Sequence, residues 1–279
     1  MNHPTTTTAQ AISIPAWESL QRAPGEARVL GRFERVVDLL LGDDILALAT
    51  PDVGCGPFHL VVDALPATPL PERVALRVLP GALWIGPWQI ALPAELPLWN
   101  PRPAWEQLTC APSRLAMLRE LVSAAARAGS VSPLAGALWG AAPASVAQLA
   151  GALDGQDPAA LDKAVAVLAG WGPGLTPSGD DFLAGLMLAL WAREGEAARP
   201  LCAGIAAAAA PRTTRLSRAF LRAAAEGLAD ERWHALLHAL AAGPEAAIER
   251  AAQAVLAFGA SSGLDMLTGF LWERMKAEG

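Results

Sequence analysis

The residues of this chain with the clearest potential for chemistry lie in one loop, at 170–181. Its sequence, GWGPGLTPSGDD, joins hydroxyls and two adjacent carboxylates to glycines that leave the backbone open to a ligand. We therefore expect the loop to form a site with Asp180 and Asp181 as catalytic residues. The expected substrate-binding residues in the loop are Gly172, Gly174, Thr176, Ser178 and Gly179.

A structural interpretation of the loop stands beside this one. Ser178 and Asp181 have the spacing of a capping box before an apolar run, and Pro177 could make Thr176 the cap instead. Capping uses one carboxylate, so it leaves Asp180 without an explanation.

The element that positions the loop is the segment that follows it. From Phe182 to Ala192 every residue is apolar or glycine, which predicts a buried central helix too short to cross a membrane. Its N-terminus would present free N–H groups to a polar ligand.

A second copy of the loop's end occurs near the C-terminus. Residues 178–185 and 262–269 share the pattern S-G-x-D-x-L-x-G, and both open an apolar segment. If the similarity is structural, two helix N-termini converge on one pocket. This adds Ser262, Gly263 and Asp265 to the candidate substrate-binding residues.

A third cluster comprises Thr213, Thr214 and Ser217 in the first turns of a predicted helix, with arginines at 212, 215, 218 and 222. Hydroxyls flanked by arginines suit a phosphate or a carboxylate. The alternative is an amphipathic helix with solvated arginines.

His234 and His238 are spaced like metal ligands, but Ala235 occupies the place of the metalloprotease glutamate, so we expect a packed or surface pair.

Composition excludes several classes of protein. The net charge of −6 gives no electrostatic basis for binding nucleic acid, and the 53% hydrophobic content includes no run long enough for a membrane span. Three isolated cysteines, with no secretory signal, favour a cytoplasmic protein.

Hydrophobic periodicity divides the 279 residues into two parts. Short apolar or alternating runs between Arg28 and Leu92 predict a β-rich domain, an antiparallel meander or small barrel. After about Leu108 the periodicity is helical. We expect an α+β protein with a loose segment at 1–20, a β-rich domain at 21–107 and an α-helical domain at 108–279. The expected helices are 113–128, 144–153, 158–170, 180–193, 198–210, 211–226, 230–242, 244–258 and 263–277.

The run GPGLTPSGDD at 172–181, followed by Leu183 and Gly185, resembles the signature of a bacterial family formerly of unknown function. That family includes the AllH-type subunit of oxamate carbamoyltransferase. The likeness extends to the β-rich half, to Trp99 and Pro101, to the 214–217 helix start and to the second S-G-x-D pattern.

The resemblance implies a role in the late steps of allantoin or purine-nitrogen breakdown. There a carbamoyl group is exchanged between oxalurate and phosphate, which gives oxamate and carbamoyl phosphate. It also implies a small anionic substrate and other subunits as partners. Two further hypotheses remain: a non-catalytic scaffold or regulatory subunit, and a stand-alone enzyme acting on a small amide or phosphate through a metal.

The charges of the loop conflict with an anionic substrate, because two carboxylates would repel it. A Mg²⁺ held by Asp180 and Asp181, or compensation by the arginines, would resolve the conflict. Otherwise the carboxylates bind an amide or ammonium group.

Overall fold

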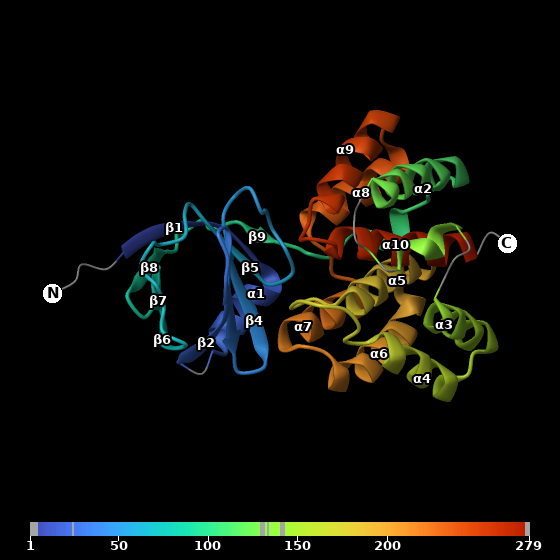
Figure 1. The fold of residues 1–279 in the computed structure, drawn as a ribbon. Helices are drawn as coiled ribbons and strands as arrows, with labels where there is room; N and C mark the ends of the chain where they lie inside the picture. Colours follow the sequence, from blue (N-terminus) through green and yellow to red (C-terminus); the bar gives the residue numbers. More distant parts are fainter. Residues whose placement is uncertain (1–4, 24, 129–131, 133, 140–142, 277–279) are drawn as a thin grey trace. The chain divides into compact units, whose positions relative to one another are not determined.

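The computed structural model describes residues 5–23, 25–128, 132, 134–139 and 143–276. The chain divides into two compact units, Met1–Pro101 and Arg102–Gly279. The first is built from strands and the second from helices (Figure 1). The expected α+β class, with the β-rich part first, is confirmed.

The first unit contains nine strands and one helix in its described part. The strands are β1 (Thr5–Ser13), β2 (Glu26–Arg32), β3 (Val36–Leu41), β4 (Asp44–Ala49), β5 (His59–Val62), β6 (Arg73–Leu79), β7 (Ala82–Ile85), β8 (Trp88–Ala91) and β9 (Leu98–Trp99), and helix α1 (Ile14–Gln21) follows β1. Gly42, at a φ of +64°, makes the two-residue turn between β3 and β4 possible, because L side chains disfavour that conformation.

The strands form a closed barrel. They are ordered β5-β4-β3-β2-β6-β7-β8-β1-β9, and β5 also pairs with β1, which closes the sheet on itself. Alternate side chains, including those of Leu39, Leu48, Leu83 and Trp88, fill the interior.

Of the two expected architectures, the small barrel is confirmed. β1 pairs in parallel with β8 and β9, and β4 pairs in parallel with β5, so the unit is a mixed barrel and not an antiparallel meander. One expectation for this unit needs correction. Residues 5–20, expected to be loose, form β1 and most of α1, whose Ser13 caps the helix by accepting a hydrogen bond from the Ala16 N–H. The four threonines of β1 suit a strand, but they lack the apolar alternation that signals one.

The second unit is helical throughout its described part. Its α-helices are α2 (Pro112–Arg127), α3 (Ala144–Gly155), α4 (Pro158–Leu168), α5 (Ser178–Glu194), α6 (Arg199–Ala209), α7 (Arg215–Ala225), α8 (Glu231–Ala242), α9 (Glu245–Leu256) and α10 (Ser262–Lys276). Short 3₁₀ helices occur at Trp105–Gln107, Ala135–Trp139, Gly195–Ala198 and Ala210–Arg212. Local caps explain several starts: Asp157, Thr214 and Asp230 each accept hydrogen bonds from first-turn N–H groups of the helix that follows.

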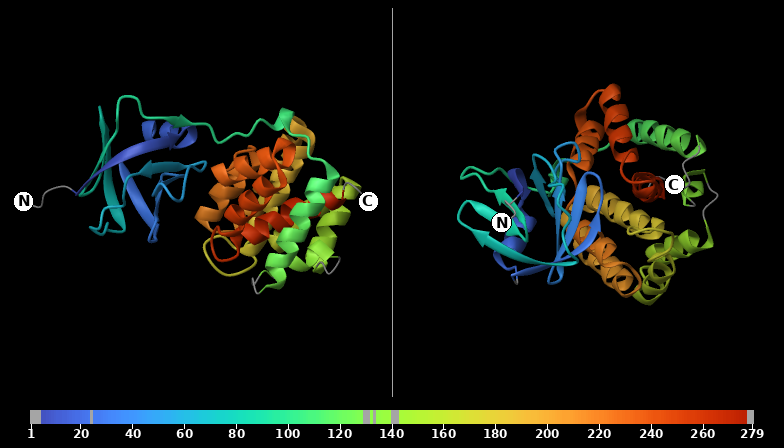
Figure 2. Two further views of the ribbon diagram at one scale, coloured as in Figure 1. Left: turned by 90° about the horizontal axis from the view of Figure 1, so that it is seen from above. Right: turned by 60° about the vertical axis from the view of Figure 1, so that its left-hand side comes forward.

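Helices α5 and α10 form the centre of this unit. They make its most extensive helix–helix contact, with α2, α8 and α9 on one side and α3, α4, α6 and α7 on the other (Figures 1 and 2). Every residue of α5 from Ser178 to Ala192 is buried, as the apolar sequence predicts.

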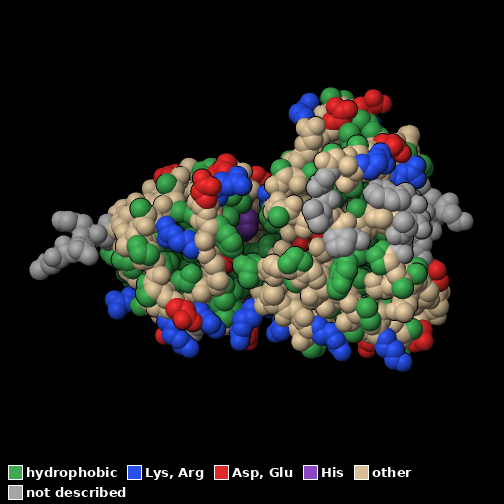
Figure 3. Space-filling model, in the orientation of Figure 1, with side chains coloured by type: hydrophobic (Ala, Val, Ile, Leu, Met, Phe, Trp, Pro, Cys, Tyr) green, Lys and Arg blue, Asp and Glu red, His purple; other side chains and the backbone are tan. Residues whose placement is uncertain are grey.

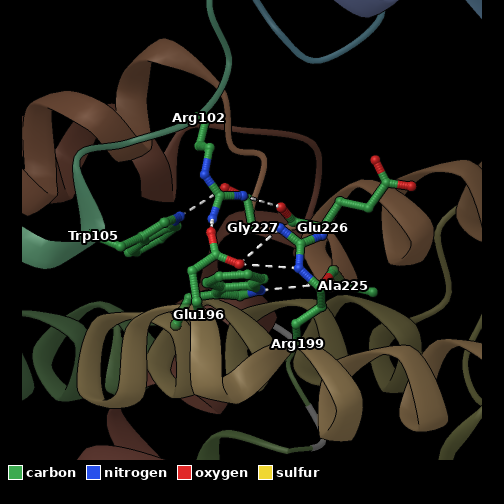
Figure 4. A network of polar contacts seen from close by, with 8 residues as sticks. Arg102, Trp105, Glu196, Arg199, Ala225, Glu226 and Gly227 are labelled. Atoms are coloured by element: carbon green, nitrogen blue, oxygen red, sulfur yellow. Dashed lines mark hydrogen bonds and ion pairs between the residues drawn. The ribbon is translucent and has the colours of Figure 1, made fainter.

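The start of the helical unit is anchored to its core. Arg102 donates a hydrogen bond to the carbonyl of Glu226 at 2.7 Å, and the Trp105 indole donates to the carbonyl of Gly227 at 2.9 Å (Figure 4). Arg102 also forms an ion pair with Glu196. The helical unit therefore begins at Arg102, earlier than the boundary expected at 107.

The face of the helical unit that Figure 3 shows carries charged and hydrophobic side chains together. Basic and acidic side chains lie interspersed near its edges, with hydrophobic side chains between them (Figure 3). Among the described residues, every helix is too short or too polar to span a membrane.

Candidate functional site

The N-terminus of α5 differs from a capping box. Its N-cap is Pro177, which makes no side-chain cap, and Ser178 is the first helical residue. The proposed caps Ser178 and Thr176 are therefore wrong, because proline at 177 shifts the start of the helix. The hydroxyls and carboxylates here are engaged in other contacts.

Asp180 is fully engaged by the protein. Its Oδ1 accepts a hydrogen bond from the backbone N–H of Gly170 at 2.9 Å. Its Oδ2 accepts from the hydroxyl of Ser217 at 2.7 Å and from that of Thr213. The carboxylate is 1% exposed and joins the start of the loop to α7.

Thr214, the third hydroxyl of the predicted cluster at 213–217, also contacts the protein. Thr214 accepts from the Ser217 N–H at 3.0 Å as the cap of α7, and donates to the carbonyl of Leu175 at 2.5 Å. Gly170 packs so closely that an added Cβ would lie 2.2 Å from the Arg212 carbonyl oxygen. The predicted cluster at 213–217 therefore holds the glycine-rich loop against α7.

Asp181 points to the opposite side, toward α10. It is 5% exposed, and its Oδ2 has no hydrogen-bond partner among the described residues. Burial raises its pKa to about 8; hydrogen bonds from Ser262 and Thr176 offset part of the rise, and the charges of Asp265 and Asp180 add to it.

Asp265 is the counterpart of Asp181 on α10. It is completely buried, and none of the residues that the structure describes forms a hydrogen bond with its Oδ2. Its Oδ1 accepts from the hydroxyl of Ser132. Burial raises the pKa of Asp265, and hydrogen bonds from Ser132, Ser178 and Ser261 offset part of that rise.

Hydroxyls connect the two helix starts reciprocally. Ser262, at the start of α10, interacts with Asp181 on α5, while Ser178, at the start of α5, interacts with Asp265 on α10. Thr176 and Ser262 are hydrogen-bonded at 3.0 Å. The structure thus brings Thr176, Ser178, Asp181, Ser262 and Asp265 together, and we call these five residues the Ser–Asp cluster.

The two sequence copies are also structural copies. The N–H of Gly179 donates to the carbonyl of Trp171 at 2.9 Å, and that of Gly263 donates to the carbonyl of Phe258 at 3.0 Å. An added Cβ would meet Leu168 O at Gly179 and Val255 O at Gly263, at 2.0 and 1.8 Å. Each copy is therefore a helix, a loop and a second helix, with the glycine packed on the end of the first.

The crossing of α5 and α10 repeats this symmetry. An added Cβ at Gly185 would lie 1.8 Å from Met266 O, and one at Gly269 would lie 2.0 Å from Phe182 O. Phe182 and Met266 occupy equivalent positions, so the contacts are reciprocal. Such a close approach of backbones requires glycine and brings the two aspartates together.

The remaining candidates are not members of the Ser–Asp cluster. Gly172, at a φ of +112°, packs against Ser178, whereas Gly174 has open space beside it. The side chains of Arg212, Arg215 and Arg218 are exposed. Among the described residues, no group of three or more His, Cys, Asp or Glu is placed to hold a metal ion. Asp180, one of the two expected Mg²⁺ ligands, directs both oxygens at protein donors.

A cavity of about 520 Å³ lies at the other end of α5, away from the cluster. Its lining includes Arg193 together with several acidic residues: Asp154, Asp157, Asp162, Glu194 and Glu273. No local sequence pattern predicts this cavity, because its lining comes from α3, α4, α5, α6 and α10.

Sequence reasoning also missed three contributors to the network around the aspartates. The backbone N–H of Gly170 contacts Asp180, and Ser132 and Ser261 contact Asp265. Ser261 adjoins a candidate residue, so it could have been found. Ser132 lies in a separate segment with no signal that connects it to α10.

Comparison with known families gives one match. The model of the family described as oxamate carbamoyltransferase subunit AllH matches residues 168–273. The chain resembles the AllH family. The matched segment begins at the end of α4 and ends within α10, so it includes the whole Ser–Asp cluster. Neither the curated proteins nor the solved structures gave a match.

Proposed function

We propose that the chain is a subunit of an oxamate carbamoyltransferase-like enzyme that interconverts oxalurate and phosphate with oxamate and carbamoyl phosphate. The observation that carries the proposal is the coincidence of the AllH-like segment with a buried cluster in which Asp181 has a pKa of about 8. Perturbed carboxyls of this kind suit proton transfer near neutral pH.

The reaction needs such a group. A phosphate oxygen attacks the carbamoyl carbon of oxalurate, the C–O bond forms and the C–N bond to the oxamate nitrogen breaks. That nitrogen must gain a proton as it leaves. Protonated Asp181 supplies it and recovers a proton from the attacking phosphate, so atoms and charge balance.

The phosphate requires positive charge that Asp181 and Asp265 do not provide. We propose that another subunit completes the site, since an anion is disfavoured beside two carboxyls. In this proposal the complex acts in allantoin or purine-nitrogen breakdown in the cytoplasm. No metal is assigned, and Asp180 and the hydroxyls at 213, 214 and 217 position the loop rather than bind substrate.

The test measures carbamoyl phosphate formed from oxalurate and phosphate, first by the purified chain and then after addition of the proteins encoded by neighbouring genes. We expect little turnover by the chain alone and clear turnover by the mixture. Turnover in no combination would refute the reaction, and robust turnover by the chain alone would refute the need for a partner.

A non-catalytic scaffold is the second candidate. It is favoured by the internal hydrogen bonds of Asp180, Thr213, Thr214 and Ser217, which direct these polar side chains at the protein itself. A scaffold predicts that substitutions in the Ser–Asp cluster alter turnover only when the complex falls apart.

A further inference from the structure

Asp181 and Asp265 lie at the centre of the helical unit, and each has one carboxyl oxygen, Oδ2, for which the described part of the fold supplies no hydrogen-bond donor. Both side chains are more than nine-tenths buried, and neither oxygen has a hydrogen-bond partner within the described part of the chain. The two oxygens therefore do not bond to each other either. A buried acceptor without a donor is costly, so this arrangement indicates a missing donor.

The chemistry of the missing group follows from what surrounds it. Two carboxyl groups interact electrostatically with each other there, which disfavours an anion. A metal ion is not supported by a third acidic, histidine or cysteine side chain among the described residues. What remains is a group with two N–H or O–H donors, and a primary amide presents two N–H donors on one nitrogen.

We propose that Asp181 and Asp265 act as a pair of acceptors that binds the –NH₂ of a carbamoyl or amide group, one N–H to each carboxyl. This assignment rests on the proposed function, and it adds Asp265 of the second copy to the site. A carboxyl that carries its proton on one oxygen still accepts on the other, so protonation of Asp181 is compatible with the role.

The surrounding hydroxyls hold the two carboxyls around such a ligand. Ser262 and Thr176 form hydrogen bonds with Asp181 and Ser178 forms one with Asp265, while Thr176 and Ser262 are also bonded to each other at 3.0 Å. Thr176 is only half-buried and leads to an exposed loop with Gly174 in open space. A ligand could therefore enter beside the loop.

The probe is oxamate, with oxalate as its comparison, because oxalate has a carboxylate oxygen where oxamate has the –NH₂. Calorimetric titrations use the full chain, alone and with partner subunits. We expect oxamate to bind at least tenfold more tightly than oxalate, since unpaired buried acceptors reject a ligand without the donor. Asp265→Asn should weaken oxamate binding about tenfold or more. The matched control, Asp157→Asn, changes a cap outside the cluster and should leave binding unchanged.

Equal affinity for oxamate and oxalate, unchanged binding by Asp265→Asn, or no oxamate binding in either preparation would overturn the assignment and leave water as the occupant. The two proposals fail separately. If the chain prefers oxamate over oxalate through Asp265 but the complex shows no carbamoyl transfer, the Asp181–Asp265 acceptor pair is supported and the proposed reaction is refuted. If carbamoyl transfer occurs and Asp265→Asn does not affect it, the reaction is supported and the acceptor pair is refuted.

Discussion

Asp180 and Asp181 are neighbours in sequence with opposite environments. Asp180 receives three hydrogen bonds, from Gly170, Thr213 and Ser217, whereas Asp181 retains a buried oxygen that no described residue contacts by a hydrogen bond. A buried carboxylate that is fully hydrogen-bonded stabilises the fold, and one that is not destabilises it when ionised. The two residues can therefore be separated by stability measurements.

Asp180→Asn should lower the free energy of unfolding by about 1–3 kcal/mol, because the amide cannot accept on both atoms. Asp181→Asn should leave stability unchanged or raise it, since it removes a buried carboxyl beside Asp265. Urea denaturation of both variants at pH 8 checks this. The opposite ranking would mean that Asp181 holds the loop and Asp180 does not.

The stability of the protein should also depend on pH through Asp181. Its pKa rises from 3.8 to about 8 on folding, so the folded state binds more protons between these values. The contribution is fully present below about pH 4 and is lost as the pH rises through 8. Asp265 acts in the same direction.

Denaturation at pH 5, 6.5 and 8 should therefore show a decline in stability that Asp181→Asn reduces. Asp157→Asn, which alters an exposed carboxylate, serves as the control. An identical decline in the wild-type chain and Asp181→Asn would show that Asp181 ionises normally.

These residue roles could be predicted from the sequence only in part. The sequence identifies the loop and both S-G-x-D copies, and the structure brings Thr176, Ser178, Asp181, Ser262 and Asp265 together. The sequence could not show that the fold holds Asp180 rather than Asp181, because the side-chain partners of Asp180, Thr213 and Ser217, lie 33 and 37 residues away, just before α7 and in its first turn.

At the scale of elements, the crossing of α5 and α10 decides where the aspartates meet. Gly185 and Gly269 let each helix contact the backbone of the other. Larger residues would separate the helices and the carboxyl groups with them. The crossing is thus both the core of the unit and the frame of the candidate site.

Gly185→Ala should destabilise the protein by about 1–3 kcal/mol, because its Cβ would lie 1.8 Å from Met266 O. Gly204→Ala, in α6, is the control: nothing lies within 4 Å of its Cβ, and alanine favours a helix, so stability should rise by about 0.5–1 kcal/mol. Thermal melting measures both. Equal effects of the two substitutions would refute the close crossing.

The elements themselves differ in how well the sequence predicts them. Helices α2 to α10 follow from local periodicity, proline starts and caps, and their bounds agree with expectation within a few residues. The strand order of the barrel does not follow from local periodicity, since the parallel pairing of β1 with β8 joins residues far apart in the chain. Local sequence carries little information about such pairs.

At the scale of the whole molecule, residues 102–107 belong with the helices that follow them. Besides their hydrogen bonds, Arg102 lies over the Trp191 ring at 4.6 Å, and Trp105 stacks on the same ring with centroids 6.2 Å apart. Gly227 fits beneath them, because an added Cβ would lie 2.8 Å from both indoles.

A fragment of residues 102–279 should fold as a helical unit and melt at a higher temperature than a fragment of residues 108–279, which lacks Arg102 and Trp105. Circular dichroism at 222 nm measures both melts. Substituting Arg102→Ala and Trp105→Ala in the longer fragment should reproduce the loss. Equal melting temperatures of the two fragments would mean that residues 102–107 do not stabilise the helical unit.

The most direct test of the account is carbamoyl transfer by the complex assembled with Asp181→Asn in place of the wild-type chain. If Asp181 is the acid–base group, the complex should assemble at the same stoichiometry, while formation of carbamoyl phosphate from oxalurate and phosphate should fall by about 100-fold or more, the usual cost of losing such a group. Wild-type turnover by the assembled variant would contradict it and would leave the Ser–Asp cluster with a structural role.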